Sequence, residues 1–325
     1  ALLLGAAVCA IKSSIDNKSH WARHALLVLS GIMAYGAYNT RTIYLFSVAL
    51  IVIGIATMLY RNHPVRTRLL AISAFSIGVA IACAPQVLIN KKNYGSLSPA
   101  VISTVENRSL FANQLLWGIT LQRYETSVDK NSPGPAVFYL DKAGELLFKE
   151  NNIGKHPFGV KEYLVLALRN PIAFIGIYGR HLVNGLDLRD GDVYTIGQTP
   201  KRSRRAVFNF MIVFLGITIM VTSSRPGTNR IGAERFFWFF VAILPVLMVL
   251  PGAIETRFFL PIHLAIYCAI ALGSDASTIL SVLRKHGLLT GLIFLLSIAI
   301  FFSVSTTTMS SQQYTYPDLY RGIWR

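Results

Sequence analysis

The chain of 325 residues carries 31 Lys and Arg against 15 Asp and Glu, which gives a formal net charge of +16. Hydrophobic residues make up 53% of the sequence and charged residues only 14%, far below the ~25% that is usual in soluble domains. This composition excludes a disordered chain, disfavours a soluble cytoplasmic enzyme and is typical of a polytopic membrane protein.

Apolar segments recur along the chain and predict an all-α polytopic membrane protein. They lie at 1–11, 25–38, 43–60, 69–90, 206–222, 236–251, 258–273 and 287–304. Each should be a helix, because a backbone in lipid must satisfy its own hydrogen bonds. The first segment is too short to cross a bilayer, so we interpret it as the end of a truncated helix. We therefore expect seven to eight transmembrane helices, in the C-terminal portion of a longer protein.

The distribution of Lys and Arg over the short connections predicts the orientation. One set of connections holds most of these residues, namely Lys12, Lys18, Arg23, Arg61, Arg66, Arg68, Arg225, Arg230, Arg235, Arg284 and Lys285. The opposite connections, 39–42 and 252–257, hold only Arg41 and Arg257. Because basic loops stay in the cytoplasm, the first set is predicted to be cytoplasmic and the second set to face outward.

This orientation divides the chain into transmembrane and extracytoplasmic parts. Transmembrane helices are expected in 1–90 and 206–304, an extracytoplasmic loop segment in 91–205 and an extracytoplasmic tail in 305–325. Helical spacing of apolar residues in Val160–Arg169 and Pro171–Leu188 predicts two amphipathic helices. Their apolar faces could lie along the bilayer surface or pack against other helices of the protein. Ser305–Gln313 is rich in Ser and Thr and predicts a surface loop.

Two short outer connections place charges between apolar helices. Arg41 follows Asn39 in the first connection, where a guanidinium could clamp phosphate oxygens or snorkel to lipid headgroups. Glu255 and Arg257 lie in the second, where a charge near the membrane should face protein, water or a ligand. The alternative for this second connection is a local ion pair that closes the turn.

Two further groups of polar residues belong to the predicted outer side. Lys91 and Lys92 directly follow the fourth apolar segment and could meet a phosphate or form a solvated helix end. Asn113 and Trp117 supply an amide, which hydrogen-bonds sugar hydroxyls, and an aromatic face, which stacks on sugar rings. The alternative for 109–118 is an amphipathic helix with Trp117 in the interfacial aromatic belt.

The order of these motifs resembles the C-terminal half of GT-C fold glycosyltransferases, multi-span enzymes that use polyprenyl-phosphate sugars. The turn Asn39–Thr42 is similar to the family's Thr-Arg-Pro turn, with Thr42 in place of Pro. Similar motifs follow in the family's order: a Pro-Asn-Gly-Pro junction at Ala84–Pro99, an Asn/Leu/Trp/Gly segment at Asn113–Gly118, a helix-breaking Arg-x-Pro at Ala167–Pro171 and a Glu-x-Arg-Tyr-x-x-Pro helix opening at Glu255–Pro261. The resemblance covers most of 25–273.

The resemblance implies a glycosyltransferase of a bacterial plasma membrane that acts at the extracytoplasmic face. Sugar would pass from a polyprenyl-phosphate donor to a surface glycan or lipid-linked acceptor. Arg41, Arg257, Lys92 and Lys91 would bind the donor phosphate, Glu255, Asn39 and Tyr94 would orient the donor, and Asn113 and Trp117 would contact the acceptor or the sugar. The family's catalytic carboxylate usually lies in a first outer loop that this sequence lacks, so the catalytic residue is unknown.

Other chemistry receives less support from the sequence. Asp187, Asp190 and Asp192 could bind a divalent cation or form a solvated loop, and no other cofactor is indicated. The sequence has no Walker loop, His-Glu-x-x-His or Gly-x-Ser-x-Gly motif, which disfavours nucleotide binding and these hydrolases. A transporter or flippase for lipid-linked sugars remains an alternative, as does a non-catalytic assembly subunit. Topology explains most basic residues, so the expected partners are lipids and glycans rather than nucleic acid.

Overall fold

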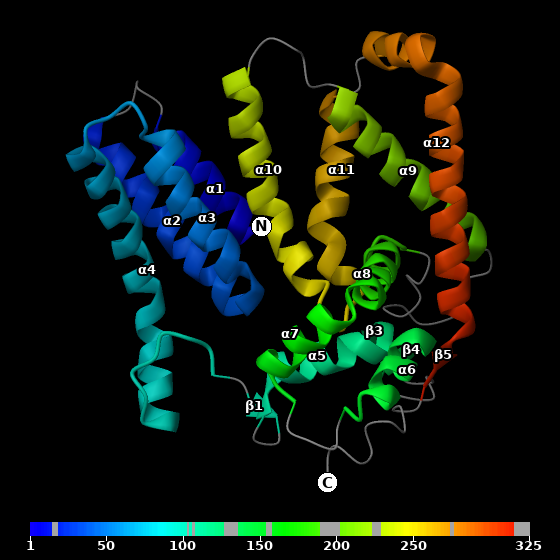
Figure 1. Ribbon diagram of the computed structural model, residues 1–325. Helices are drawn as coiled ribbons and strands as arrows, with labels where there is room; N and C mark the ends of the chain where they lie inside the picture. Colours follow the sequence, from blue (N-terminus) through cyan, green and yellow to red (C-terminus); the bar gives the residue numbers. More distant parts are fainter. Residues whose placement is uncertain are drawn as a thin grey trace. The chain divides into compact units, whose positions relative to one another are not determined.

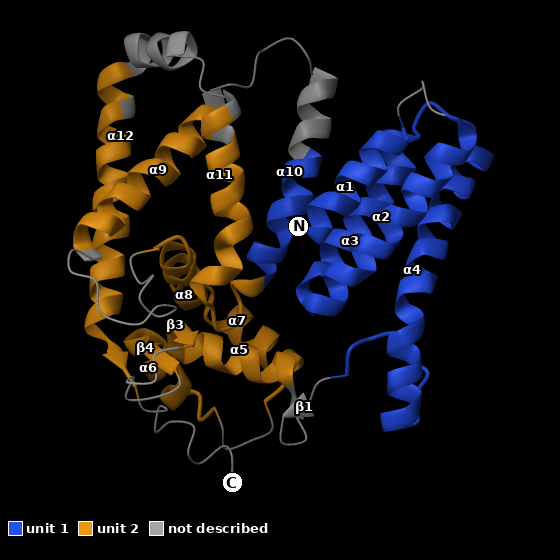
Figure 2. Cartoon of the chain, turned by 180° about the vertical axis from the view of Figure 1, so that it is seen from behind, with its two compact units in different colours: residues 1–103, 226–248 blue, residues 104–225, 249–325 orange. Residues whose placement is uncertain are grey.

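The computed structural model describes residues 1–14, 19–102, 104–105, 108–126, 136–153, 158–188, 202–222, 229–273 and 276–314 (Figure 1). The chain forms two compact units, coloured blue and orange in Figure 2. Unit 1 comprises 1–103 and 226–248, and unit 2 comprises 104–225 and 249–325. Each unit has helices and a core of its own.

Unit 1 is built from helices. They are α1 (Leu2–Ser13), α2 (His20–Thr40), the short η1 (Thr42–Tyr44), α3 (Leu45–Gly54), the π-helical turn η2 (Ile55–Leu59), α4 (Val65–Tyr94) and α10 (Asn229–Val249). Hydroxyl groups tie neighbouring helices together inside this unit: Ser30 donates to the carbonyl of Ala6 (2.7 Å), and Ser47 donates to that of Val241 (2.8 Å). Such bonds satisfy polar groups that would be costly in an apolar bundle.

Two glycines allow α2 and α4 to pack at backbone contact. A Cβ on Gly31 would lie 2.1 Å from the carbonyl oxygen of Phe75, and a Cβ on Gly78 would lie 2.0 Å from that of Val28. Any larger residue at either position would therefore force the helices apart. Small residues at such crossings are the usual means by which apolar helices approach closely in membranes.

Unit 2 combines helices with a small antiparallel sheet. Its elements are β1 (Thr104–Val105), β2 (Arg108–Ser109), α5 (Leu110–Thr120), β3 (Leu121–Thr126), β4 (Ala136–Leu140), α6 (Lys142–Glu150), α7 (Val160–Arg169), α8 (Pro171–Gly185), α9 (Arg202–Thr222), η4 (Thr256–Phe259), α11 (Leu260–Gly273), α12 (Ala276–Ser310) and β5 (Gln312–Gln313). The strands pair in the order β3-β4-β5. The predicted amphipathic helices are confirmed as α7 and α8.

The prediction of a surface loop at Ser305–Gln313 is wrong. Helix α12 continues to Ser310, and Gln312–Gln313 forms strand β5 beside β4. Ser305 and Thr308 are fully buried, and Asp187, which follows α8, and Gln122 of β3 supply their hydrogen-bond partners. Their polar character therefore marks tertiary hydrogen bonds rather than contact with water.

The chain is mostly helical, as predicted, and some of its helices have the length and composition of membrane spans. Among the residues that the structure describes, three helical segments are long and apolar enough to cross a bilayer: Thr42–Leu59, Val65–Tyr94 and Gly287–Ser310. Leu2–Ser13 and Phe237–Val249 are apolar but shorter. Large apolar side chains on two of these segments are exposed, including Leu69, Ile77, Ile81 and Leu88 of α4 and Leu292 and Leu296 of α12. This surface suits lipid better than water.

Candidate functional site

The connection that leads into η4 lies against α5 and β3 of unit 2. Two backbone hydrogen bonds hold it, from Ala253 N–H to the carbonyl of Gln114 (3.0 Å) and from Tyr124 N–H to the carbonyl of Ile254 (2.9 Å). Gly118 permits the close approach, because a Cβ there would lie 2.4 Å from the carbonyl oxygen of Pro251. The backbone is therefore fixed on both sides directly before Glu255.

Glu255 and Arg257 form a two-point ion pair at the start of η4. Arg257 Nη2 lies 2.8 Å from Glu255 Oε1, and Arg257 Nε contacts Glu255 Oε2. The Glu255 side chain is 1% exposed, whereas the Arg257 side chain is 44% exposed. The buried carboxylate therefore fixes the orientation of the Arg257 guanidinium, which faces outward. A planar guanidinium held in one orientation suits recognition of an anion.

Tyr124 and Trp117 extend this pair into an aromatic cluster. The Tyr124 hydroxyl donates to Glu255 and accepts from Gln114. Burial, reinforced by the charge of Glu255, raises the pKa of Tyr124 above its ordinary value, so the hydroxyl remains a donor at physiological pH. Trp117 meets the Tyr124 ring edge-on, with centroids 6.3 Å apart. The structure thus brings Trp117, Glu255 and Arg257 together, and Tyr124 is the linking residue that the sequence analysis missed.

A second ion pair lies fully inside unit 2. Arg123 Nε is 2.8 Å from Glu125 Oε1, and both side chains are fully buried. The backbone N–H of Thr256 donates to the same carboxylate oxygen (2.9 Å), and its hydroxyl contacts it as well. Arg123 also lies over the ring of Tyr139, 5.1 Å from its centroid. Residues two positions apart in a strand share one face, so the spacing of Arg123 and Glu125 is compatible with an ion pair and could have indicated it from the sequence.

Asn113 lies one helical turn before Trp117 on α5. Its side chain is buried, and its Nδ2 has no hydrogen-bond partner within the part of the chain that the structure describes. A buried amide without a partner costs free energy, so this group is either a strained element of the core or a donor kept for a ligand. A helix forms over Leu110–Thr120, and both the sugar-binding role of Asn113 and the interfacial-belt position of Trp117 stay predictions.

The other predicted residues gather at one end of unit 1. The segment that follows α4 is bound by α2 through Tyr35, whose hydroxyl donates to Pro99 O (2.8 Å), and through Tyr38, whose hydroxyl accepts from Val101 N–H (3.3 Å). The same segment is bound by α4, because Asn90 Nδ2 donates to the carbonyls of Ser98 (2.7 Å) and Ala100 (2.8 Å). The C-terminal ends of α2 and α4 therefore lie at the same end of this unit.

The candidate residues at this end of unit 1 differ in exposure. Asn39 lies near the end of α2 and is exposed, and Arg41, its C-cap residue, is partly buried. Lys91, Lys92 and Tyr94 occupy the last turn of α4 and are exposed. Basic residues in a last turn are stabilised by the helix dipole, so this position also suits a plain solvated helix end. That these residues share a site with Arg257 of unit 2 stays a prediction.

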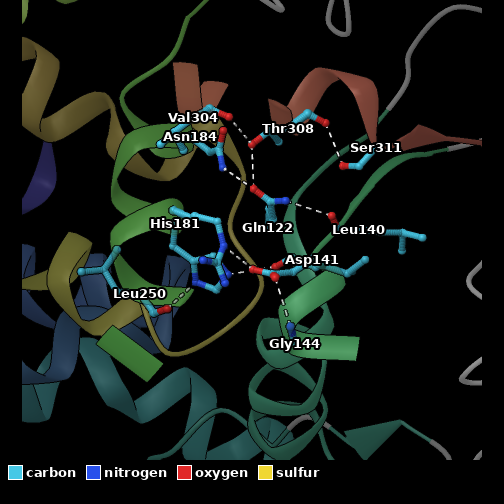
Figure 3. A network of polar contacts seen from close by, with 12 residues as sticks. Gln122, Leu140, Asp141, Gly144, His181, Asn184, Leu250, Val304, Thr308 and Ser311 are labelled. Carbon is cyan, nitrogen blue, oxygen red and sulfur yellow. Dashed lines mark hydrogen bonds and ion pairs between the residues drawn. The ribbon is translucent and has the colours of Figure 1, made fainter. Parts of the chain in front are cut away.

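A buried polar network joins α8 to neighbouring elements of unit 2 (Figure 3). His181 of α8 has Nδ1 2.6 Å from the carbonyl oxygen of Leu250 and Nε2 2.9 Å from that of Leu121. His181 thereby connects α8 to β3 and to the connection that carries Glu255. Burial lowers the pKa of His181, and its two carbonyl contacts act in the opposite direction. Asp141 caps α6 through Gly144 N–H (3.0 Å) in the same network.

The expectation of a solvated acidic loop is wrong for Asp187. This residue is fully buried and its Oδ2 accepts from the hydroxyl of Ser305. Asp190 and Asp192 lie outside the described residues. Among the residues that are described, no group of three or more His, Cys, Asp and Glu side chains is arranged to hold a metal ion.

Among the residues that the structure describes, the carboxylates near Arg257 are already paired. Glu255 is engaged by Arg257 and Tyr124, and Glu125 is engaged by Arg123 and Thr256. Each carboxylate thereby fixes the orientation of its arginine. The aromatic rings of Trp117 and Tyr124 add surface on which a sugar can pack.

Comparisons with known proteins do not assign this chain to a family. No protein-family model, no curated protein and no solved structure matches the chain.

Proposed function

We propose that the chain is part of an integral-membrane glycosyltransferase of the GT-C type. It takes a sugar from a polyprenyl-phosphate donor and passes it to a surface glycan or a lipid-linked acceptor, at the extracytoplasmic face of a bacterial plasma membrane. The proposal includes seven to eight spans, in which α1, α2, α9, α10 and α11 accompany the three segments that are long and apolar enough to cross a bilayer.

The observation that carries the proposal is the half-exposed Arg257 fork held by buried Glu255 beside Trp117 and Tyr124. A sugar phosphate presents a dianionic or monoanionic head next to a ring with hydroxyl groups. An oriented guanidinium suits the first group, and an aromatic face suits the second. In the proposed reaction Arg257 stabilises the negative charge that develops on the departing phosphate, which is electrostatic stabilisation of a leaving group.

Replacement of Arg257 by Ala tests the proposed role. The full chain is reconstituted in nanodiscs, and binding of a fluorescent polyprenyl-phosphate sugar is measured for wild type, Arg257→Ala, Arg257→Lys and Lys149→Ala, an exposed basic control in α6. We expect at least a tenfold loss of affinity for Arg257→Ala, which corresponds to about 1.4 kcal/mol, a smaller loss for Arg257→Lys and no change for Lys149→Ala. Equal affinity of all four variants would refute the phosphate role.

A non-catalytic assembly subunit is the second candidate function. It is favoured by the observation that the described carboxylates of this cluster are both engaged in ion pairs. Sugar transfer measured on the same nanodiscs separates the two: donor binding with transfer supports the enzyme, and donor binding without transfer supports the subunit. Movement of the labelled donor between the leaflets of sealed vesicles would instead identify a transporter or flippase.

A further inference from the structure

Helices α7 and α8 each carry two apolar faces. One face is used by the fold: Tyr163, Leu166, Phe174 and Ile177 are buried in the core cluster of unit 2. The other face is exposed and forms what we call the outer ridge, which consists of Leu164, Leu168, Ile172 and Ile175.

Three residues of the outer ridge are largely exposed. Leu168 is 81% exposed, Ile172 is 84% exposed and Ile175 is 70% exposed. Leu168 and Ile172 flank the Asn170–Pro171 break between the helices, so both helices contribute exposed apolar residues close to the break. Several large exposed apolar residues on neighbouring helices indicate a contact with another molecule or with a membrane.

The depth of α8 relative to the membrane-span candidate α12 points to lipid. Gln122 Oε1 accepts from Asn184 of α8 (3.4 Å) and from Thr308 of α12 (2.7 Å), so both helices meet at one side chain (Figure 3). Thr308 belongs to the last turn of Gly287–Ser310, the apolar segment of α12. Asn184 belongs to the last turn of α8, and the end of a membrane span lies at the headgroup layer, so the C-terminal end of α8 lies near that level.

Charges beside the ridge indicate which lipids it contacts. Lys161 and Arg169, at the two ends of α7, are exposed. The acidic residue of this helix, Glu162, lies in its first turn and caps it, because its Oε2 accepts from Gly159 N–H (2.9 Å). Exposed apolar residues between basic ones are typical of helices that lie in the interface of anionic membranes.

We propose that the outer ridge of α7 and α8 inserts into the headgroup and acyl-chain boundary of a bilayer that contains anionic phospholipid. The ridge then holds unit 2 against the membrane surface, beside the connection that carries Arg257. This inference rests on the membrane location proposed above and is independent of sugar transfer.

Spin labels at single cysteines test the ridge directly. The full chain, with Cys9, Cys83 and Cys268 replaced by Ser, is reconstituted in vesicles of phosphatidylcholine and phosphatidylglycerol. Labels are placed at Leu168 and Ile172, at Leu292 of α12 as the lipid reference and at Lys149 of α6 as the water reference. Accessibility to oxygen and to a water-soluble nickel complex is then measured. We expect Leu168 and Ile172 to favour oxygen at least threefold over the Lys149 label.

The outcomes separate the ridge from the membrane location. If the Ile172 label resembles Lys149 while the Leu292 label is in lipid, the ridge proposal is overturned and the membrane location stands. If the Ile172 label is shielded from both reagents, a protein surface or a second copy covers the ridge, and the proposal is also overturned. If the Leu292 label is in water, the membrane location fails and the ridge proposal fails with it. Unchanged accessibility in Lys161→Glu/Arg169→Glu overturns the role of anionic lipid.

Discussion

Two Arg–Glu pairs of the same chemistry have different environments and therefore different expected roles. Arg123 and Glu125 are fully buried and join β3 to Thr256, whereas Arg257 reaches solvent while Glu255 does not. A buried pair costs desolvation on both sides and contributes little to net stability, but it is hard to break from one side. The first pair thus fixes the shape of the site, and the second pair can exchange water for a ligand.

Replacement of Arg123 by Met should destabilise unit 2 strongly. The change leaves the Glu125 carboxylate buried without its cation, which typically costs about 3–5 kcal/mol. The unfolding midpoint of the detergent-solubilised chain, followed by circular dichroism, measures the effect. The double variant Arg123→Met/Glu125→Gln should lose much less stability, because it leaves no buried charge without its partner. If the single and double variants lower the unfolding midpoint equally, the loss of stability does not come from the broken ion pair.

The sequence predicted the charged residues of the connection better than the residues of β3 that surround them. Glu255 and Arg257 stand out because charges are rare between apolar segments. Tyr124 and Arg123 do not stand out, because their partners are far away in sequence and the strand that carries them has no run of alternating apolar residues. Asn113 was selected for its amide, but its burial could not be foreseen from the sequence.

At the scale of elements, hydrophobic periodicity identified the helices and missed the sheet. Each predicted apolar segment falls largely within a helix, because length and composition suffice for a helix in an apolar environment. Strand β5 was predicted as part of a loop, because two Gln residues carry no strand signal and depend on β4 for pairing. Ser305 and Thr308 were predicted to lie in a surface loop for the same reason: the partners of their hydroxyl groups are distant in sequence.

Substitution of Gly78 by Leu should separate α2 from α4. A side chain at this position meets the backbone of Val28, which cannot move aside as a flexible side chain could. Overpacking of this kind costs about 1–3 kcal/mol, and more where backbone must shift. Thermal unfolding in detergent measures it, with Gly287→Leu as the control, since nothing lies within 4 Å of a Cβ there. Similar unfolding midpoints for the two variants would contradict the close packing.

At the scale of the whole molecule, the central prediction concerns the side of the membrane on which the charged residues lie. Single cysteines at Asn39, Leu260 and Arg61, all exposed positions, are placed in the cysteine-free background and treated with a membrane-impermeant maleimide. We expect Asn39 and Leu260 to react from the extracytoplasmic side, because their connections are poor in basic residues. Arg61 should react only after permeabilisation. Reaction of Asn39 and Leu260 from opposite sides would rule out a shared donor site for Arg41 and Arg257.

Helix α4 has a further consequence, because basic residues mark both ends of its apolar stretch. Arg68, whose Nε donates to the carbonyl of His63 (3.0 Å), and Lys91 are separated by about 35 Å at the α-helical rise, a little more than the ~30 Å thickness of a hydrocarbon layer. The apolar length of α4 thus matches one bilayer thickness. A thinner bilayer would force the helix to tilt, which would displace Lys91 and Lys92 sideways. Donor affinity should therefore peak in bilayers with a hydrocarbon core of about 30 Å and fall in thinner or thicker ones. Equal donor affinity in vesicles of graded acyl-chain length would show that bilayer thickness does not affect the donor site.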